Sequence, residues 1–155
     1  MTRAEQNQAA VWALTLVMFG SIAGNYLSAS IAKRIGYRRA IAFMLLAYGL
    51  TMLAAFSRPW SHAETLGWFA LIGMCQGAFA LFTMCLPPLF PTLLRTTGAG
   101  FCYNFGRIAA AAGTIFFGIF RKVGDVREVL FYAGILFIPA AIVALLLPEP
   151  DDVER

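Results

Sequence analysis

Apolar residues along this chain occur in five long blocks that are separated by short polar or basic turns. The blocks cover residues 9–32, 39–57, 66–87, 98–120 and 129–147. A helix needs about 20 residues to cross the ~30 Å hydrocarbon core of a bilayer, and each block is about that long. The pattern predicts an all-α, polytopic membrane protein. We expect a single transmembrane domain, 1–155, with five transmembrane helices and an acidic C-terminal tail, 148–155.

Composition and the placement of charge agree with a chain embedded in lipid. Hydrophobic residues make up 60% of the sequence and charged residues 13%, whereas soluble globular domains contain about 25% charged residues. Arg107 is the one basic residue well inside a block, and every Asp and Glu lies outside the blocks. The net charge of +4 therefore belongs to turns and tails beside anionic headgroups. We expect the lipid bilayer as a partner, and no nucleic acid.

The sequence offers no pattern typical of a metal site or an enzyme. Cys75, Cys85 and Cys102 lie in apolar blocks, with no CxxC spacing and no nearby histidine. We interpret them as small hydrophobic residues packed between helices. The chain has no HExxH, no GxSxG, no Gly-rich phosphate loop and no paired aspartates inside a block. We expect no metal, no cofactor and no enzymatic activity.

The five blocks differ in polarity, which predicts their positions. Residues 40–56 and 130–147 carry almost nothing polar beyond Tyr and Thr, as expected of lipid-facing helices. The other three blocks contain the polar side chains Asn25, Gln76, Asn104 and Arg107. Polar side chains at membrane depth normally face protein or a wet cavity, and small residues let helix backbones approach. We therefore expect these three helices to form an inner wall, with contacts through Gly24, Gly77 and Gly106.

The order of helix types is inner, outer, inner, inner, outer. If the repeating unit is a triplet of two inner helices and one outer helix, the first copy lacks its first member. The turns Lys33-Arg34-Ile35-Gly36 and Arg121-Lys122-Val123-Gly124 end corresponding helices in the two copies. The pattern predicts a missing helix before residue 1.

Basic residues give a weak indication of orientation. With five crossings, the turn at 33–39 and the C-terminus share one side, which carries six basic residues against five on the other. Four of the six crowd the single short turn 33–39. By the positive-inside rule, we expect this turn and the tail on the cytoplasmic side of the cell membrane.

Two segments resemble the major facilitator superfamily. The turn from Ala29 to Arg39 resembles the basic loop of that superfamily, with Arg34, Gly36 and Arg38 at matching positions. The segment from Phe90 to Arg107 is similar to the connection between the tenth and eleventh helices in metabolite:proton symporters of this superfamily. The resemblance implies helices eight to twelve of a twelve-helix transporter, built from inverted repeats. It also implies a missing N-terminal helix bundle as the partner of this chain.

Four side chains are candidates for binding substrate: Arg107, Asn104, Tyr103 and Gln76. Arg107 lies about nine residues, or roughly 13 Å of helix, beyond Gly98. That depth is near the bilayer middle, where a charged side chain needs a partner or water. The alternative for Arg107 is that it snorkels or locks neighbouring helices together. The alternative for Gln76 and Asn104 is an interhelical hydrogen bond. Asn25 and Thr83 are weaker candidates.

The basic turn is a candidate gating loop, composed of Arg34, Gly36 and Arg38. Its arginines can pair with acidic residues or helix C-termini in one conformation and release them in another. The alternative is that the turn only sets topology. Proton relays in carriers generally need an intramembrane carboxylate or histidine. If the carrier is proton-coupled, the coupling residue therefore lies outside this chain.

These observations favour transport of a small hydrophilic metabolite, such as a sugar or an organic acid, by alternating access. The chain would act as part of a larger carrier, with or without proton coupling, because five helices cannot enclose a substrate without an opposing bundle. The competing hypothesis is a truncated or stand-alone membrane protein with a structural or interaction role. Such a protein would assemble with itself or with a separate half, and it would not transport on its own.

Overall fold

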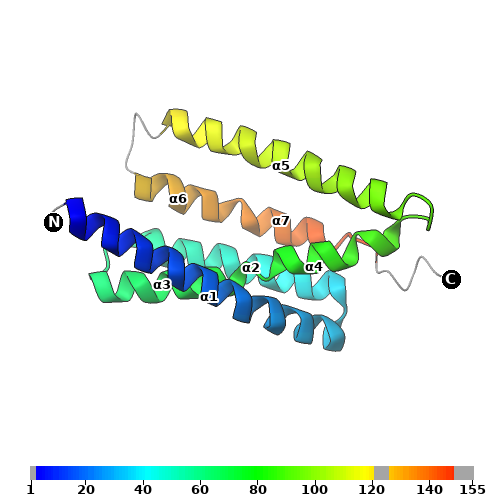
Figure 1. Ribbon diagram of the computed structural model, residues 1–155, viewed down its shortest axis with the longest axis horizontal. Coiled ribbons are helices and arrows are strands. Elements are labelled where there is room, and N and C mark those ends of the chain that lie inside the picture. The colour runs from blue at the N-terminus through cyan, green and yellow to red at the C-terminus, as the bar shows by residue number, and fades with distance from the viewer. Residues whose placement is uncertain (1–2, 121–125, 149–155) are drawn as a thin grey trace.

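The computed structural model describes residues 3–120 and 126–148, and within these ranges it contains helices and no strand (Figure 1). In chain order the elements are α1 (Arg3–Ile35), α2 (Tyr37–Ser57), α3 (His62–Cys75), α4 (Ala78–Cys85), the 3₁₀ helix η1 (Pro87–Leu89), α5 (Arg95–Phe120), α6 (Val126–Ile135) and α7 (Phe137–Ala144). The all-α fold predicted from the apolar blocks is confirmed.

A single residue, Gly36, separates α1 from α2. Its φ of 87° lies in the region that side chains disfavour, so glycine is needed at this turn. The Gly36 N–H donates to the carbonyl of Ala32 at 2.9 Å, and the Gly36 carbonyl accepts from the N–H of Ala40 at 3.1 Å. The turn therefore continues the hydrogen bonding of both helices while it reverses the chain.

A capping box starts α3 four residues before the apolar block at 66–87. The Ser61 hydroxyl accepts from the backbone N–H of Glu64, and a carboxylate oxygen of Glu64 accepts from the Ser61 N–H at 2.9 Å. These two reciprocal bonds satisfy N–H groups at the helix start. The polar residues Ser61 to Glu64 thus extend the helix beyond the apolar sequence.

Two blocks that we expected as continuous helices are each divided. Block 129–147 breaks at Leu136, between α6 and α7. Pro139 explains this break, because it cannot donate the N–H that would bond the Ile135 carbonyl. Block 66–87 breaks at Gln76 and Gly77, where the chain makes tighter bonds over three residues. One of them joins the Gly77 N–H to the carbonyl of Met74 at 3.3 Å.

The second helix is central, and the prediction that it lies outside is wrong. α2 contacts α1, α3, α4, α6 and α7, and lies between the α1–α3 pair and α6–α7 (Figure 1). Its buried residues are Ala40, Ile41, Ala42, Met44, Leu45, Gly49, Met52 and Ala55. An apolar helix surface suits lipid and protein equally, because lipid tails are as apolar as leucine. Several of these residues are small, which allows close helix packing.

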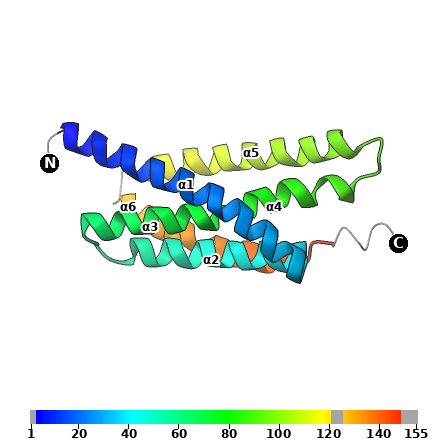
Figure 2. The same ribbon diagram turned by 60° about the horizontal axis from the view of Figure 1, so that its bottom comes forward.

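The predicted contact between the first and third helices is confirmed, but the predicted contact through Gly106 is wrong. A Cβ atom added to Gly24 would collide with the Met74 carbonyl, and one added to Gly77 would collide with the Gly24 carbonyl. The same test at Gly106 meets no atom within 4 Å. α5 runs along the edge of the bundle, which explains this open space (Figure 2).

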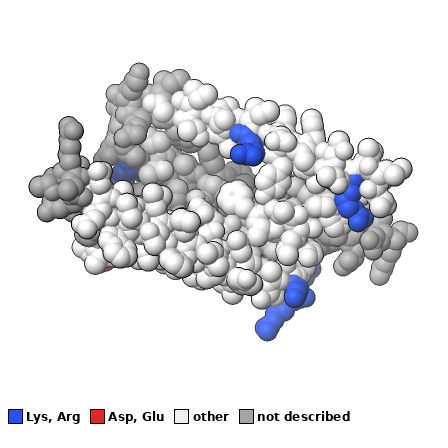
Figure 3. Space-filling view, in the orientation of Figure 1, with Lys and Arg blue, Asp and Glu red and all other residues white. Residues whose placement is uncertain are grey.

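Four segments are long and apolar enough to cross a membrane: Asn7–Ile35, Tyr37–Ser57, Ala63–Leu89 and Arg127–Ala144. α5 has sufficient length at 26 residues, but polar residues such as Asn104 and Arg107 lower its mean hydropathy. Large apolar side chains, including Trp12 and Phe19, are exposed on the bundle surface. Most of the face in Figure 3 likewise carries no charge. The structure is that of a multi-pass membrane protein.

Candidate functional site

A groove with polar walls lies between α1, the break that separates α3 from α4, and α5. We call it the polar groove. It is open to the outside and has a volume of about 500 Å³. Its lining residues are Ser21, Asn25, Gln76, Phe79, Ala80, Thr83, Met84 and Tyr103. None of these eight residues carries a charge. Two predicted substrate-binding residues, Gln76 and Tyr103, are therefore brought to one site.

Close packing of α1 against α3 positions the amides in this groove. Gly24 and Gly77 touch backbone to backbone, and each is next in sequence to an amide residue, Asn25 or Gln76. The glycine contact therefore places these two amides near one another. Beneath them, the fully buried Ser28 donates from its hydroxyl to the Asn25 carbonyl at 3.0 Å. The buried hydroxyl is thus satisfied within the protein.

Tyr103 joins α5 to α4 through a hydrogen bond. Its hydroxyl oxygen lies 2.8 Å from the hydroxyl oxygen of Thr83. The Thr83 hydroxyl also lies 3.1 Å from the Phe79 carbonyl, to which it donates. Tyr103 is therefore the donor in the pair, because a hydroxyl has one hydrogen to give. The bond fixes the Tyr103 ring at the edge of the polar groove.

Arg107 lines a neighbouring groove, which we call the apolar groove. It has a volume of about 330 Å³, and its lining residues are Phe79, Phe82, Leu86, Cys102, Tyr103, Gly106, Arg107 and Ala110. The two grooves share Phe79 and Tyr103. None of the described side chains forms an ion pair with Arg107. A positive charge thus lines a groove whose described lining contains no other charged side chain. Phe79 and Tyr103 lie between this groove and the one that contains the amides of Asn25 and Gln76.

Asn104 lies outside both grooves. Its side-chain amide donates to the carbonyl of Gly100 in its own helix at 2.9 Å. Asn104 and Arg107 were both predicted to bind substrate, and the structure does not bring them into one groove. Asn25 and Thr83, which the sequence ranked lower, line the polar groove instead.

Ser21 is a groove residue that sequence reasoning missed. It precedes Asn25 by four residues and therefore lies on the same face of α1. That spacing was the available signal, but serine is common in membrane helices and did not stand out. Within residues 3–120 and 126–148, no group of His, Cys, Asp and Glu side chains is arranged to hold a metal ion.

The candidate gating loop is separate from both grooves. Gly36 forms the turn itself, Arg34 is exposed and Arg38 is half-buried. Arg34 lies nine residues beyond Asn25 on α1, which corresponds to about 13 Å of helix. The loop therefore stands at the end of the membrane span, where it can contact other segments but not a ligand in the polar groove.

Comparison with known proteins identifies the family. The family model of the Major Facilitator Superfamily matches residues 5–155. The chain belongs to this superfamily. Relatives within it are membrane transporters, and the apolar spans described above fit that assignment. The resemblance of the turn from Ala29 to Arg39 and of the segment from Phe90 to Arg107 is thereby explained at the level of the superfamily.

Three curated proteins illustrate what the chain is similar to. The probable 4-methylmuconolactone transporter of Cupriavidus pinatubonensis is 27% identical over 136 residues, which is 86% of this chain and 32% of the relative. Mouse solute carrier family 22 member 7 is 32% identical, with 81% of this chain and 25% of the relative covered. The uncharacterized transporter YycB of Bacillus subtilis is 29% identical, with 69% and 27% covered. The chain spans about a third or less of the length of these relatives.

Proposed function

We propose that this chain is part of a carrier that moves a small hydrophilic metabolite across the cell membrane by alternating access. The observation that carries the proposal is the polar groove, where uncharged polar side chains gather within otherwise apolar membrane spans. Polar side chains within membrane segments commonly mark a substrate pathway. The substrate class that fits is a sugar or an organic acid.

The chemistry of the lining residues supports this substrate class. The amides of Asn25 and Gln76 can each donate and accept hydrogen bonds, and the Tyr103 hydroxyl can accept while it donates to Thr83. Such groups suit the hydroxyl and carbonyl oxygens of a sugar or an acid. Arg107 adds a positive charge in the adjoining groove, where its planar guanidinium can bind a carboxylate in bidentate fashion.

A second helix bundle is part of the proposal. The polar groove is open, and alternating access requires a bundle that faces it and rocks against it. We assign this chain to helices eight to twelve of a metabolite:proton symporter, with an N-terminal bundle as its partner. Arg34, Gly36 and Arg38 would then act in gating at the mouth of the carrier. Any proton-coupling carboxylate would belong to the partner bundle.

The name of one relative is compatible with this substrate class. 4-Methylmuconolactone is a small oxygen-bearing metabolite, and the carrier named for it shares 27% identity with this chain. A ligand of that kind could present its oxygens to the Gln76 amide and its apolar part to Phe79. The name of this relative is consistent with a small polar substrate. The binding experiment below distinguishes sugars from organic acids.

Ligand binding to the chain in lipid nanodiscs tests the proposal. Equilibrium dialysis with radiolabelled sugars and organic acids should identify a ligand whose affinity falls about three- to tenfold in Gln76→Ala. That is the effect of losing one neutral hydrogen bond. Gln8→Ala is the matched control, because Gln8 is exposed near the start of α1 and far from the groove. Equal loss of affinity in Gln76→Ala and Gln8→Ala would contradict the proposal.

The competing hypothesis, a membrane protein with an interaction role, rests on the exposed surface of α5. No atom lies within 4 Å of a Cβ placed at Gly100 or Gly106, so this surface has room for another helix. A chain that binds no ligand but forms a stable oligomer of defined mass in detergent would favour this hypothesis. Ligand binding that depends on Gln76 would favour the carrier.

A further inference from the structure

Tyr48 on the central helix α2 contacts both places where a membrane helix is broken. Its ring packs edge-on against Phe137, which begins α7 after the break at Leu136, and the ring centres are 4.5 Å apart. Its hydroxyl forms a side-chain hydrogen bond with Gln76, at the break between α3 and α4. Tyr48 itself lines neither the polar groove nor the apolar groove. One residue thus links the candidate ligand-binding amide to α7, on the other side of α2.

A second contact between α2 and the break at Gln76 supports this placement. The sulfur of Cys75, the residue before Gln76, lies 3.7 Å from the hydroxyl oxygen of Thr51. Thr51 follows Tyr48 by three residues, so the two side chains share one face of α2. That face is therefore turned towards the break, where the Tyr48 hydroxyl reaches Gln76.

Close packing of α2 against α6 and α7 holds the Tyr48 ring. A Cβ added to Gly49 would lie 3.0 Å from the Cβ of Phe137 and 3.1 Å from the carbonyl oxygen of Gly134. The glycine next to Tyr48 therefore lets the helices approach closely. Edge-to-face contact is a favourable arrangement for two aromatic rings. The contact with Phe137 thus restricts the Tyr48 ring and gives its hydroxyl a defined position.

The backbone of Gln76 is fixed by the break, but its side chain needs a partner to be ordered. The Gln76 N–H donates to the carbonyls of Ile72 and Gly73 at 3.2 and 3.1 Å, and its carbonyl accepts from the Phe79 N–H at 3.0 Å. The side chain retains its rotatable bonds, and ordering it when a ligand binds lowers the affinity. The amide offers one carbonyl and two N–H groups. A bond to Tyr48 leaves the remaining groups available to the polar groove.

We propose that Tyr48 is a positioning residue, whose hydroxyl holds the Gln76 amide in the orientation that binds ligand in the polar groove. The Phe137 ring in turn holds Tyr48. This arrangement strengthens binding, because the Gln76 side chain is already ordered before a ligand arrives. The role of Tyr48 towards a ligand rests on the proposed function. The fixed orientation of the amide is independent of it and can be measured without a ligand.

NMR of the chain in lipid nanodiscs, with isotope-labelled glutamine side-chain amides, tests this orientation. The sequence contains three glutamines, Gln6, Gln8 and Gln76, and the Gln76→Ala variant assigns the signal of Gln76. We expect the Gln76 amide to have a higher order parameter than the amide of Gln8, which is exposed. Tyr48→Phe removes the hydroxyl and keeps the ring. It should lower the order parameter of the Gln76 amide to that of Gln8.

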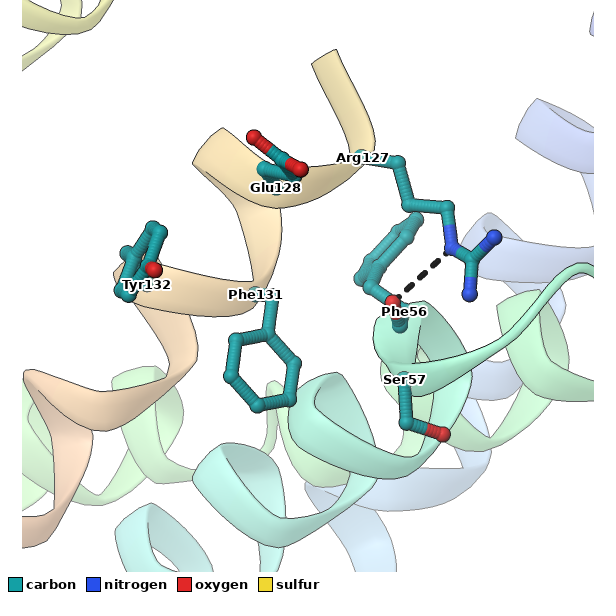
Figure 4. A pocket seen from close by; sticks show the side chains of 6 residues that line it. All are labelled: Phe56, Ser57, Arg127, Glu128, Phe131 and Tyr132. Carbon is teal, nitrogen blue, oxygen red and sulfur yellow. Dashed lines mark hydrogen bonds between the residues drawn. The ribbon is translucent and has the colours of Figure 1, made fainter. Parts of the chain in front are cut away.

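Tyr132→Phe is the matched control, because Tyr132 is exposed on α6 and lines a separate pocket, which it shares with Glu128 (Figure 4). It should leave the Gln76 amide as ordered as in the unmodified chain. Phe137→Leu should lower the order part of the way, since Tyr48 keeps its hydroxyl but loses the ring that holds it. Unchanged order in Tyr48→Phe would overturn the proposal. Unchanged order in Phe137→Leu would overturn the part assigned to Phe137.

Ligand binding tests the role of Tyr48 in recognition, with the radiolabelled sugar or organic acid that equilibrium dialysis selects as the probe. Tyr48→Phe should weaken its binding about two- to tenfold, the effect of ordering one flexible side chain on binding. The double variant Tyr48→Phe, Gln76→Ala should bind as weakly as Gln76→Ala alone, because Tyr48 acts through Gln76. Losses that add would overturn the positioning role. Equal losses in Gln76→Ala and Gln8→Ala would instead count against the proposed function, and the NMR result would still decide the orientation of the amide.

Discussion

Arg107 shows how a single residue links the structure to the proposed function. It lies near the middle of α5, and if that helix crosses the membrane, insertion of arginine at this depth costs at least about 2.5 kcal/mol. Its groove offers it two phenylalanine rings and a leucine, and no described side chain forms an ion pair with it. An anionic ligand or a contact with a second bundle would offset this insertion cost of the Arg107 charge. The two explanations predict different mutant behaviour.

We expect Arg107→Ala to weaken binding of an organic acid at least about tenfold, because loss of a charge-assisted hydrogen bond removes about 1.5–3 kcal/mol. Arg107→Lys should restore only part of the affinity, since lysine keeps the charge but loses the planar fork. Membrane insertion should be unaffected, because removal of an intramembrane charge eases insertion. Binding isotherms of the chain in nanodiscs, recorded beside melting curves, provide the measurement.

Arg95→Ala serves as the control for Arg107, because Arg95 is exposed at the start of α5 and lines neither groove. It should leave the affinity unchanged. If Arg107 instead locks helices together, Arg107→Ala and Arg107→Lys would both lower the melting temperature and leave affinity unaltered in the folded fraction. That result would remove Arg107 from the ligand site and leave Gln76 as the leading candidate.

The sequence identified part of the site because intramembrane polarity is a strong signal. Gln76 and Tyr103 were singled out as polar residues in apolar blocks, and both line the polar groove. Asn104 carried the same signal but donates to Gly100 in its own helix. A composition pattern cannot distinguish an amide that satisfies its own backbone from one that faces a cavity. Helix rotation decides between them, and it depends on packing against other helices.

At the scale of elements, close contacts were easier to predict than the position of a helix in the bundle. The small residues Gly24 and Gly77 predicted that the first helix meets the third, and a Cβ added at either glycine would collide with backbone atoms. The position of α2 was predicted wrongly because lack of polar residues does not distinguish lipid from protein surroundings. Pro139 in the sequence indicates the break at Leu136, because proline lacks the N–H that a continuous helix needs. The break at Gln76 has no such signal.

The glycine contact between α1 and α3 can be tested with a matched pair of variants. In Gly77→Ala, the new Cβ would collide with the backbone of Gly24, which cannot move aside as a flexible side chain can. Overpacking of this kind destabilises a protein by about 1–3 kcal/mol. The replacement of glycine by alanine in a helix stabilises it by at most about 1 kcal/mol, so the net effect is destabilising. We expect a melting temperature roughly 2–8 °C lower in detergent.

Gly106→Ala is the control, because it makes the same substitution in a helix where no atom lies within 4 Å of the new Cβ. Its melting temperature should be unchanged or slightly higher, since alanine favours helix. If the two variants behave alike, the backbone contact between α1 and α3 does not limit stability. Circular dichroism at 222 nm, followed on heating, would report both.

At the scale of the whole molecule, the arrangement of the helices indicates how often the chain crosses the membrane. α5 begins beside η1 and ends near the start of α6, so it runs the length of the bundle (Figure 1). It is not among the four segments that are apolar enough to cross a membrane by length and composition, because it contains polar residues such as Asn104 and Arg107. If α5 crosses the membrane, the turn at 33–39 and the tail at 148–155 lie on the same side.

Labelling of single cysteines in intact cells tests both the number of crossings and the orientation. In a chain whose three native cysteines are replaced by alanine, Arg39→Cys and Glu154→Cys should resist a membrane-impermeant maleimide, because the basic turn is expected in the cytoplasm. Ser57→Cys, at the other end of α2, should react readily. Labelling at Arg39→Cys but not at Ser57→Cys would reverse the orientation. Different labelling of Arg39→Cys and Glu154→Cys would instead show that the chain crosses the membrane an odd number of times between the turn and the tail, and α5 would then not span the membrane.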